Sequence, residues 1–419
     1  MLTKIEALKY RALHYTNQTL DRFQVLIGPN ASGKSTFLDV VAFMADIINK
    51  PSLTDAVRER VPDLRDLTWL RNSDWLELAI EADIPPNLSS RYTRLRYEIR
   101  LGIEQESSEI SLLGENLWFI TQASELSDDY GLMKQRQLFP TSPTPPPTIV
   151  RESKTHKPTG WRKIVSKTNT GNDYFQSETT DWKNNFRLSP RRPALANLPE
   201  DEVRFPVSTW FKRYLSEGVQ RIMLNSEELR KPSPPQSPRT FLSDGSNLPW
   251  VIYGLEKDYP ELLQDWIEHI RTALPDIRSI VTVERPEDRH RYLIVEYDSG
   301  LKAPAWLVSD GTLRMLALTI LAYLPKLTGV YLIEEPENGI HPRAVETVFQ
   351  SLSRMYEAQV FLATHSPVIL SLTDRSQLLC FARTETGETD IVRGDLHPSL
   401  IDWDGKVNLS ILFAGGVLG

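Results

Sequence analysis

The spacing of hydrophobic positions predicts alternating strands and helices at both ends of the chain. Residues 23–27 form a short apolar run typical of a buried strand, and residues 35–48 follow with apolar side chains on one side, as in an amphipathic helix. Toward the other end, helix 312–324 precedes strand 330–333, and helix 342–356 precedes strand 360–363. Strands and helices that alternate at these lengths predict a largely parallel sheet with helices on its faces.

Between these ends the pattern changes. Residues 76–82 and 95–101 alternate apolar and polar side chains, which is typical of half-exposed antiparallel strands. Two proline-rich stretches, 140–147 and 232–238, bracket a less regular region, and such runs cannot hold a helix or a central strand. We therefore predict an α/β fold in three parts: an N-terminal lobe (1–123), an inserted lobe (124–240) and a C-terminal lobe (241–419) that ends in an apolar tail.

The composition of the chain excludes several classes of protein but does not indicate a function. The 419 residues are 40% hydrophobic and 25% charged, as in ordinary globular proteins, and the net charge of -7 does not indicate nucleic acid for the chain as a whole. The single cysteine, Cys380, excludes an internal disulfide framework and a Cys-rich zinc site. The most apolar stretch, 313–324, is about a dozen residues, whereas a bilayer span needs about twenty. The N-terminus lacks the apolar core of a signal peptide. We expect a soluble cytoplasmic protein without a membrane partner.

The strongest chemical signal is a glycine loop between the first strand and the first helix. Its sequence, Gly-x-x-x-x-Gly-Lys-Ser, is the Walker A pattern. Glycines let backbone N–H groups curl around phosphates, and the helix N-terminus adds positive potential. Lys34 would pair with the β- and γ-phosphates of ATP, and the Ser35 hydroxyl would coordinate Mg²⁺. The alternative is a tight glycine turn with an accidental lysine. The predicted nucleotide-binding residues of this loop are Gly28, Pro29, Asn30, Ala31, Ser32, Gly33, Lys34, Ser35 and Thr36.

A second candidate region is the acidic end of strand 330–333. Two carboxylates, Glu334 and Glu335, follow the strand directly, and strands of a parallel sheet deliver their C-terminal residues to the ligand crevice. Glu334 would hold Mg²⁺ through water, and Glu335 would orient or deprotonate the attacking water. The alternative is an ordinary acidic turn after a strand.

Two further segments have positions suited to phosphate. Ser309 can cap helix 312–324, and Gly311 leaves the first N–H groups of that helix open to an anion. One nucleotide needs only one phosphate loop, so a second anion site suggests a second protomer; the alternative is a plain helix cap. His365 lies two residues after the end of strand 360–363 and could hydrogen-bond the γ-phosphate as a neutral imidazole, although a lone histidine is more often structural.

Taken together and in this order, these motifs resemble those of ABC-type ATPases. The set comprises the Walker A loop, Ser309-Asp310-Gly311, Glu334-Glu335, Glu337-Asn338-Gly339-Ile340-His341-Pro342 and Thr364-His365-Ser366. More closely it resembles the RecF/SMC-like and OLD-like branch, AAA-family ATPases that are often bacterial and include defence proteins. The opening Lys9-Tyr10-Arg11-Ala12-Leu13 looks like the start of that branch.

The resemblance implies a P-loop ABC-ATPase head that uses ATP and Mg²⁺ in a head-to-tail homodimer or higher oligomer. Ser309 and Gly311 would contact the γ-phosphate bound to the partner, and Asn338 would cross the interface in a D-loop over 337–341. Arg11 would lie near the base or phosphates. The sequence departs from the family pattern in two places. The signature lacks the Leu-Ser-Gly-Gly-Gln form of transporter ATPases, and segment 67–72, at the expected place of the Q-loop, contains no glutamine.

The inserted lobe carries a basic segment. Residues 151–192 hold ten Lys/Arg against four Asp/Glu, a local net charge of 10 − 4 = +6, with aromatic residues interleaved. Positive charge with stacking rings suits nucleic acid or an acidic partner. The simpler interpretation is a solvated lobe that uses its aromatic residues as a small core.

These observations favour an ATPase whose ATP-driven dimerisation regulates a separately encoded effector or acts on DNA, in anti-phage defence or DNA repair. The sequence shows no second catalytic constellation, so a separate effector protein is the expected partner. One alternative is the ATPase subunit of a membrane transporter. Another is a nucleotide-gated scaffold that hydrolyses ATP too slowly to matter.

Overall fold

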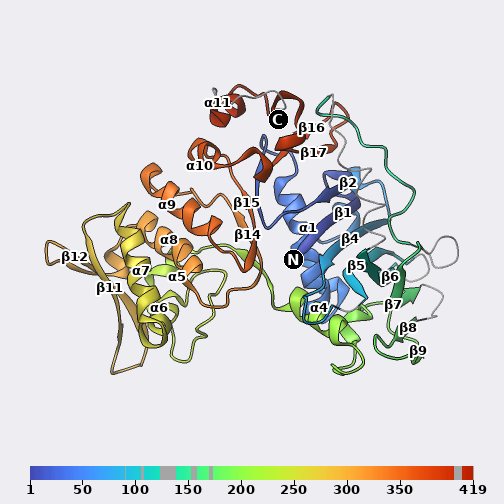
Figure 1. The fold of residues 1–419 in the computed structure, drawn as a ribbon, viewed down its shortest axis with the longest axis horizontal. Helices are drawn as coiled ribbons and strands as arrows, with labels where there is room; N and C mark the ends of the chain where they lie inside the picture. The colour runs from blue at the N-terminus through green and yellow to red at the C-terminus, as the bar shows by residue number, and fades with distance from the viewer. Residues whose placement is uncertain are drawn as a thin grey trace. The chain divides into compact units, whose positions relative to one another are not determined.

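The computed structural model describes residues 1–89, 91–104, 108–122, 138–151, 158–168, 173–400 and 408–418. The described chain forms two compact units (Figure 1). Unit 1 comprises Met1–Val219, Arg375–Lys406 and Gly416–Gly419, and unit 2 comprises Gln220–Asp374 and Val407–Gly415. The division into three lobes at 123/124 and 240/241 stays a prediction.

Unit 1 contains an eight-stranded antiparallel sheet in the order β2-β1-β4-β5-β6-β7-β8-β9. Its strands are β1 (Leu2–Tyr10), β2 (Leu13–Thr19), β4 (Trp75–Asp83), β5 (Tyr92–Ile103), β6 (Ile110–Thr121), β7 (Trp161–Thr168), β8 (Asp173–Gln176) and β9 (Lys183–Phe186). The antiparallel strands predicted at 76–82 and 95–101 are confirmed as β4 and β5, with Leu78 opposite Ile99.

A second group of strands in unit 1 carries the glycine loop. β3 (Phe23–Ile27) pairs in parallel with β16 (Leu378–Arg383), and β16 pairs antiparallel with β17 (Thr389–Arg393). Helix α1 (Lys34–Asn49) follows the loop, confirms the prediction for 35–48, and contacts β1 and β4 through its buried face (Figure 1). Among the described residues, the other helices of this unit are α2 (Leu53–Arg58), α4 (Pro206–Ser216), η1 (Leu64–Leu67), η2 (Trp69–Arg71), η3 (Leu195–Asn197), η6 (Arg375–Gln377), η7 (Gly394–Leu396) and η8 (Pro398–Leu400).

Unit 2 contains a parallel strand pair that carries the acidic residues. β14 (Gly329–Glu334) pairs in parallel with β15 (Ala358–Ala363), and the short β10 (Val219–Ile222) lies on the other side of β14. A separate three-stranded antiparallel sheet consists of β11 (Ile277–Glu284), β12 (Arg291–Tyr297) and β13 (Lys302–Pro304). The helices are α5 (Ser226–Arg230), α6 (Leu248–Asp258), α7 (Pro260–Arg271), α8 (Asp310–Thr319), α9 (Pro342–Ser353), α10 (Pro367–Leu372), α11 (Leu409–Ala414), η4 (Ala305–Leu307) and η5 (Ile320–Tyr323).

The helix predicted over 312–324 is present but ends earlier than expected. Helix α8 ends at Thr319, and the chain tightens there into the 3₁₀ turn η5. The Thr319 hydroxyl donates to the Met315 carbonyl at 2.8 Å, and such local bonding competes with continued helix. The proline-rich stretches form no helix or strand, apart from a single bridge between Ser233 and Arg291. Within the described residues, no helix has the length and apolarity required to cross a bilayer.

Candidate functional site

The two glycines of the loop occupy positions where a side chain would collide. Gly33 caps α1 with a φ of 102°, and a Cβ there would lie 2.4 Å from the Thr389 hydroxyl oxygen. A Cβ on Gly28, whose φ is 151°, would lie 2.3 Å from the Phe381 carbonyl oxygen. Both distances are too short for a methyl group, so β16 and β17 force the loop to be glycine at these positions. The backbone is thereby free to turn tightly between β3 and α1.

The interior of the loop fits an anion. Lys34 is buried, and its ammonium donates to the carbonyl oxygens of Gly28 and Pro29 at 2.8 and 2.9 Å. The hydroxyl of Ser32 is also buried and has no hydrogen-bond partner among the described residues. A buried hydroxyl without a partner is costly, and a phosphate oxygen would supply the missing acceptor. Ser35 is exposed at the start of α1, beside the positive end of the helix.

Thr389 of β17 supports the loop through a hydrogen bond, and this role could not be predicted from the sequence. Its hydroxyl donates to the Ser32 carbonyl at 2.9 Å, and its N–H donates to the Ala12 carbonyl at 3.1 Å. Thr389 therefore joins the phosphate loop to the turn between β1 and β2. Thr389 and Ser32 are 357 residues apart, and no local pattern marks a threonine for such a role.

The β1–β2 turn contains Arg11, which the resemblance places near the nucleotide. Arg11 has a φ of 48° and forms an ion pair of 3.3 Å with Asp39 of α1. The neighbouring Tyr10 is fully buried and donates its hydroxyl to the same carboxylate at 2.6 Å. Burial, together with the charge of Asp39, raises the pKa of Tyr10 well above its ordinary value. Asp39 thus ties Arg11 to the helix that follows the phosphate loop.

In unit 2, each acidic residue of the strand end has a partner. Glu334 is the last residue of β14 and forms an ion pair of 2.7 Å with Arg221 of the neighbouring β10. Glu335 is exposed, and its φ of 47° is uncommon for a residue with a side chain. Its N–H donates to the Ala363 carbonyl at 2.8 Å, and its carboxylate accepts a hydrogen bond from Asn338. Such backbone strain is often found at functional positions.

The segment after these acids is bonded to the predicted histidine loop. One oxygen of Glu337 accepts from the Thr364 hydroxyl at 2.6 Å and from the His365 backbone N–H at 3.0 Å. The ring centroids of His365 and Phe413 are 6.3 Å apart. Glu337 therefore fixes the backbone at the end of β15. Its contacts join the predicted D-loop segment to His365, the residue predicted to hydrogen-bond the γ-phosphate.

The predicted signature lies against the same D-loop segment. Ser309 caps α8 by accepting from the Thr312 N–H at 3.2 Å, as expected from the sequence. A Cβ on Gly311 would lie 2.4 Å from the Gly339 carbonyl, so the close approach requires glycine. Asp310 accepts from Ser226 and pairs with Arg230 at 2.9 Å, and these contacts lower the pKa of its carboxyl group. Within unit 2 the structure thus brings the predicted signature and the predicted D-loop segment together.

The described residues contain no group of three or more His, Cys, Asp or Glu side chains arranged to hold a metal. Mg²⁺ in nucleotide enzymes takes one or two protein oxygens and completes its shell with phosphate and water. Ser35 and Glu334 are oxygen donors of that kind. The donor chemistry of each of these two residues therefore fits a magnesium ion that arrives with a nucleotide, and their joint role as metal ligands stays a prediction.

Much of the basic segment 151–192 is used in internal contacts. Trp161 is buried against Trp118, with ring centroids 6.0 Å apart. Lys163 donates to the Asn116 side chain at 2.8 Å, Lys167 to the carbonyls of Ser189 and Arg192, and Arg162 to those of Ser177 and Glu178. Residues 152–157 and 169–172 of this segment lie outside the described residues. The described contacts favour the structural interpretation of this segment.

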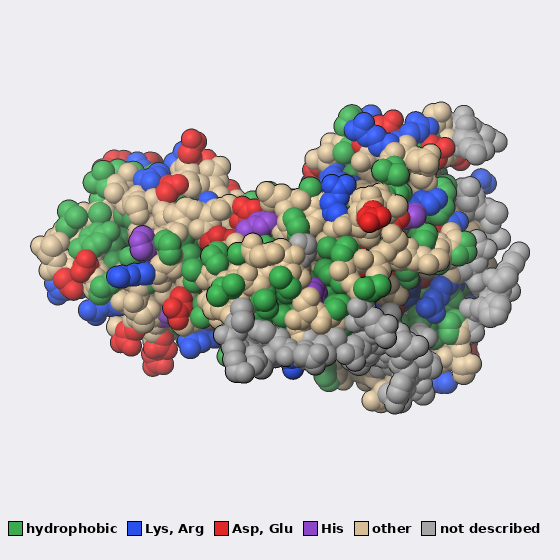
Figure 2. Space-filling model, turned by 90° about the horizontal axis from the view of Figure 1, so that it is seen from above, with side chains coloured by type: hydrophobic (Ala, Val, Ile, Leu, Met, Phe, Trp, Pro, Cys, Tyr) green, Lys and Arg blue, Asp and Glu red, His purple; other side chains and the backbone are tan. Residues whose placement is uncertain are grey.

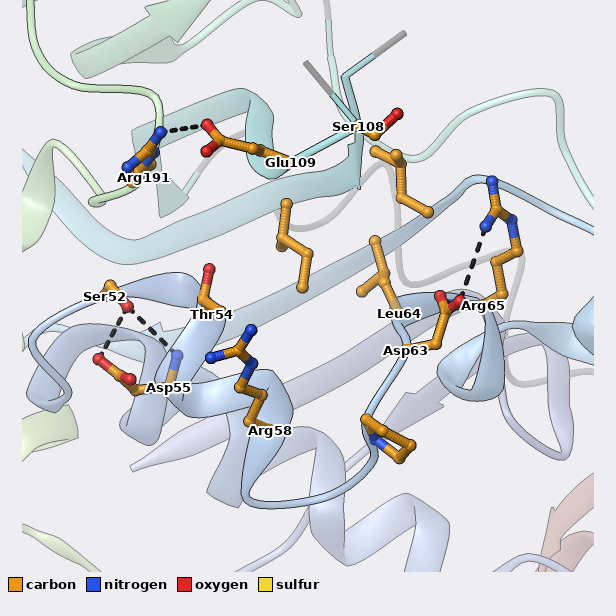
Figure 3. Close-up of a pocket in the computed structure, with 13 residues that line it drawn as sticks. Ser52, Thr54, Asp55, Arg58, Asp63, Leu64, Arg65, Ser108, Glu109 and Arg191 are labelled. Atoms are coloured by element: carbon orange, nitrogen blue, oxygen red, sulfur yellow. Dashed lines mark hydrogen bonds and ion pairs between the residues drawn. The ribbon is translucent and has the colours of Figure 1, made fainter.

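A pocket of about 610 Å³ in unit 1 is lined by charged residues, but none of them belongs to the predicted nucleotide set (Figure 3). Arg191 pairs with Glu109, and Arg65 pairs with Asp63 (Figure 3). Arg65 also pairs with Asp74 at 2.8 Å. Opposite charges thus compensate one another across its wall. We assign this pocket no role in nucleotide binding.

Comparison with known proteins places the chain in a fold class. The Smc head domain crystallised with the C-winged helix domain of ScpA is 12% identical, with a TM-score of 0.53 over 93% of this chain and 96% of that one. An Smc head with an extended coiled coil, bound to the C-terminal domain of ScpA derived from Pyrococcus furiosus, is 11% identical, with a TM-score of 0.52 over 93% and 95%. At these identities the likeness concerns the fold alone, and it confirms the predicted ABC-ATPase head. A search of curated proteins returned no match.

A family model gives the assignment. It matches residues 23–371, from the strand before the phosphate loop to the helix after His365. That span contains every predicted site residue except Arg11, so the motifs and the match describe the same part of the chain. The chain therefore has a fold like that of Smc heads and belongs to the family described as AAA domain, putative AbiEii toxin, Type IV TA system (AAA_21).

Proposed function

We propose that this protein binds ATP through its phosphate loop and hydrolyses it with Glu335 as the general base. The observation that carries the proposal is the interior of the loop, where the buried Lys34 ammonium and the unpartnered Ser32 hydroxyl lie between glycines that exclude side chains. These groups are suited to phosphate oxygens. The family assignment supports the same activity.

In the proposed reaction, the Glu335 carboxylate accepts a proton from the attacking water while Lys34 and the N-terminus of α1 stabilise phosphate charge. Asn338 orients Glu335 through its side-chain amide. His365 donates a hydrogen bond to the γ-phosphate, and Glu337 holds its backbone. When bound, Mg²⁺ neutralises charge on the phosphates, and Ser35 and Glu334 would hold it.

We further propose that hydrolysis requires a head-to-tail dimer, in which Ser309 and Gly311 of one protomer reach the nucleotide of the other. Trp306 and Leu307, which are separated from Ser309 only by the buried Val308, are 46% and 71% exposed. Hydrophobic side chains are also visible on the surface at the end of unit 2 that carries β11 and β12 (Figure 2). Exposed large apolar side chains beside a polar motif are common at protein interfaces, which supports a second protomer there.

The biological role that we propose is control of a separate effector in bacterial defence. The family description names a putative toxin of a type IV toxin–antitoxin system, and the Smc heads of similar fold bind ScpA. Both support an ATPase that works with another protein. Since much of the basic segment is engaged internally, we place direct action on DNA second.

The test combines turnover with oligomeric state. Glu335→Gln should retain ATP binding, lose about 100-fold or more in hydrolysis and accumulate as a dimer with ATP, because the base is removed while the phosphate contacts remain. Glu346→Gln, an exposed glutamate on α9 of the same unit, should behave as wild type. If Glu335→Gln hydrolyses ATP normally, the base assignment is wrong, and if it stays monomeric with ATP, the dimer is wrong. Wild-type turnover at background level would favour the slow scaffold instead.

A further inference from the structure

The ion pair between Arg221 and Glu334 involves a residue that the nucleotide motifs do not include. The guanidinium Nη2 lies 2.7 Å from Oε1 of Glu334. Arg221 belongs to β10, the strand next to β14, and its side chain is 44% exposed, while that of Glu334 is 26% exposed. The arginine can therefore leave the carboxylate without disrupting a packed core.

This contact competes with the role proposed for Glu334. A carboxylate that pairs with a guanidinium has one oxygen engaged and its negative charge compensated. A divalent cation near the same oxygen would also be repelled by the arginine, since like charges a few ångströms apart raise each other's energy. Mg²⁺ binding at Glu334 therefore has to displace Arg221 or act against its charge.

We propose that Arg221 is a positioning residue that occupies Glu334 until Mg²⁺–ATP arrives, and so lowers the benefit that Mg²⁺ gives to ATP binding. The inference rests on the proposed function, because it assumes that Glu334 serves the metal that accompanies ATP. Arg221 acts through Glu334 and not on the nucleotide. Its effect is a regulation of metal dependence that the motif pattern alone does not contain.

The experiment measures the dissociation constant of ATP with Mg²⁺ and with EDTA, by calorimetry on the full chain. The ratio of the EDTA value to the Mg²⁺ value is the Mg²⁺ gain. Arg221→Gln should raise this gain about three- to fivefold, the range expected when a partly exposed ion pair is removed. Arg221→Lys keeps the charge and should stay near wild type. Arg239→Gln, which removes an exposed 2.7 Å pair with Asp258 in the same unit, is the matched control and should change nothing.

A double-mutant cycle separates the contact from a general charge effect. In a Glu334→Gln background, Arg221→Gln should leave the Mg²⁺ gain unchanged, because the shared carboxylate is gone. An unchanged or reduced gain in Arg221→Gln alone would overturn the inference, as would an equal rise in the Glu334→Gln background. If wild-type protein binds no ATP with or without Mg²⁺, the proposed function itself fails. Thermal melts check that each variant is folded.

Discussion

The phosphate loop of unit 1 and the acidic strand end of unit 2 are built in different ways. In the loop, the Lys34 ammonium is buried and bonded to backbone carbonyls of the loop itself, and the neighbouring strands leave no room for side chains at its glycines. At the strand end, both carboxylates lie partly or fully open to solvent and are held by side chains, Glu334 by Arg221 and Glu335 by Asn338. One region is fixed by its backbone, whereas the other depends on exchangeable side-chain contacts.

The difference indicates a division of work. A backbone-fixed loop can bind phosphate with little rearrangement, which favours affinity. Carboxylates held by exposed partners can change partners when metal, nucleotide or a second protomer arrives, which suits a reaction that must wait for assembly. Substitutions in the loop should therefore change binding, and substitutions at the strand end should change turnover or metal dependence.

The largest effect should come from Lys34→Ala. It removes the charge that would pair with phosphate and leaves the carbonyls of Gly28 and Pro29 without their buried donor. Hydrogen bonds to charged groups contribute about 1.5–3 kcal/mol each, so ATP affinity should fall about 100-fold or more. Calorimetry with ATP measures it, and Lys50→Ala, at the other end of α1, is the control. Unchanged ATP affinity in Lys34→Ala would show that the loop does not bind the nucleotide.

The sequence could predict these regions because their signals are local. The run 23–27, the glycines and Lys34 are contiguous, and β3 and α1 appear where the spacing indicates. The capping role of Ser309 is likewise confirmed, since a cap depends on the next three residues. The end of α8 was missed because a single threonine hydroxyl, and not the apolar pattern, competes with the helix.

The partners of the site residues could not be predicted. Arg221 and Glu334 are 113 residues apart, and no neighbouring residue in the sequence marks either of them as a partner of the other. The resemblance assigned Asn338 to a dimer interface, whereas in the structure its amide donates to Glu335 of the same chain. Its role across an interface stays a prediction. Such pairs arise from strand order and loop geometry, which a one-dimensional pattern does not encode.

A smaller effect, confined to turnover, should follow from Glu337→Ala. The substitution removes the acceptor that the Thr364 hydroxyl and the His365 N–H share. Loss of one to two charge-assisted hydrogen bonds should misplace His365 and lower the turnover number about tenfold, with ATP affinity nearly unchanged. Glu337→Gln keeps an acceptor oxygen and should recover much of the rate. Equal losses in affinity and turnover would contradict the division of work, because Glu337 would then contribute to binding.

The smallest effect is expected from Thr389→Val, which tests how much the hydrogen bond from Thr389 contributes to the conformation of the phosphate loop. Thr389→Val keeps the branched shape that faces Gly33 but removes the hydroxyl bonded to the Ser32 carbonyl. A neutral hydrogen bond contributes about 1 kcal/mol, so ATP affinity should fall about fivefold while turnover at saturating ATP stays at the wild-type value. Thr386→Val, in the same β16–β17 hairpin but exposed, is the matched control. A loss of turnover without loss of affinity in Thr389→Val would reverse the comparison, because the loop would then take part in the reaction beyond holding phosphate.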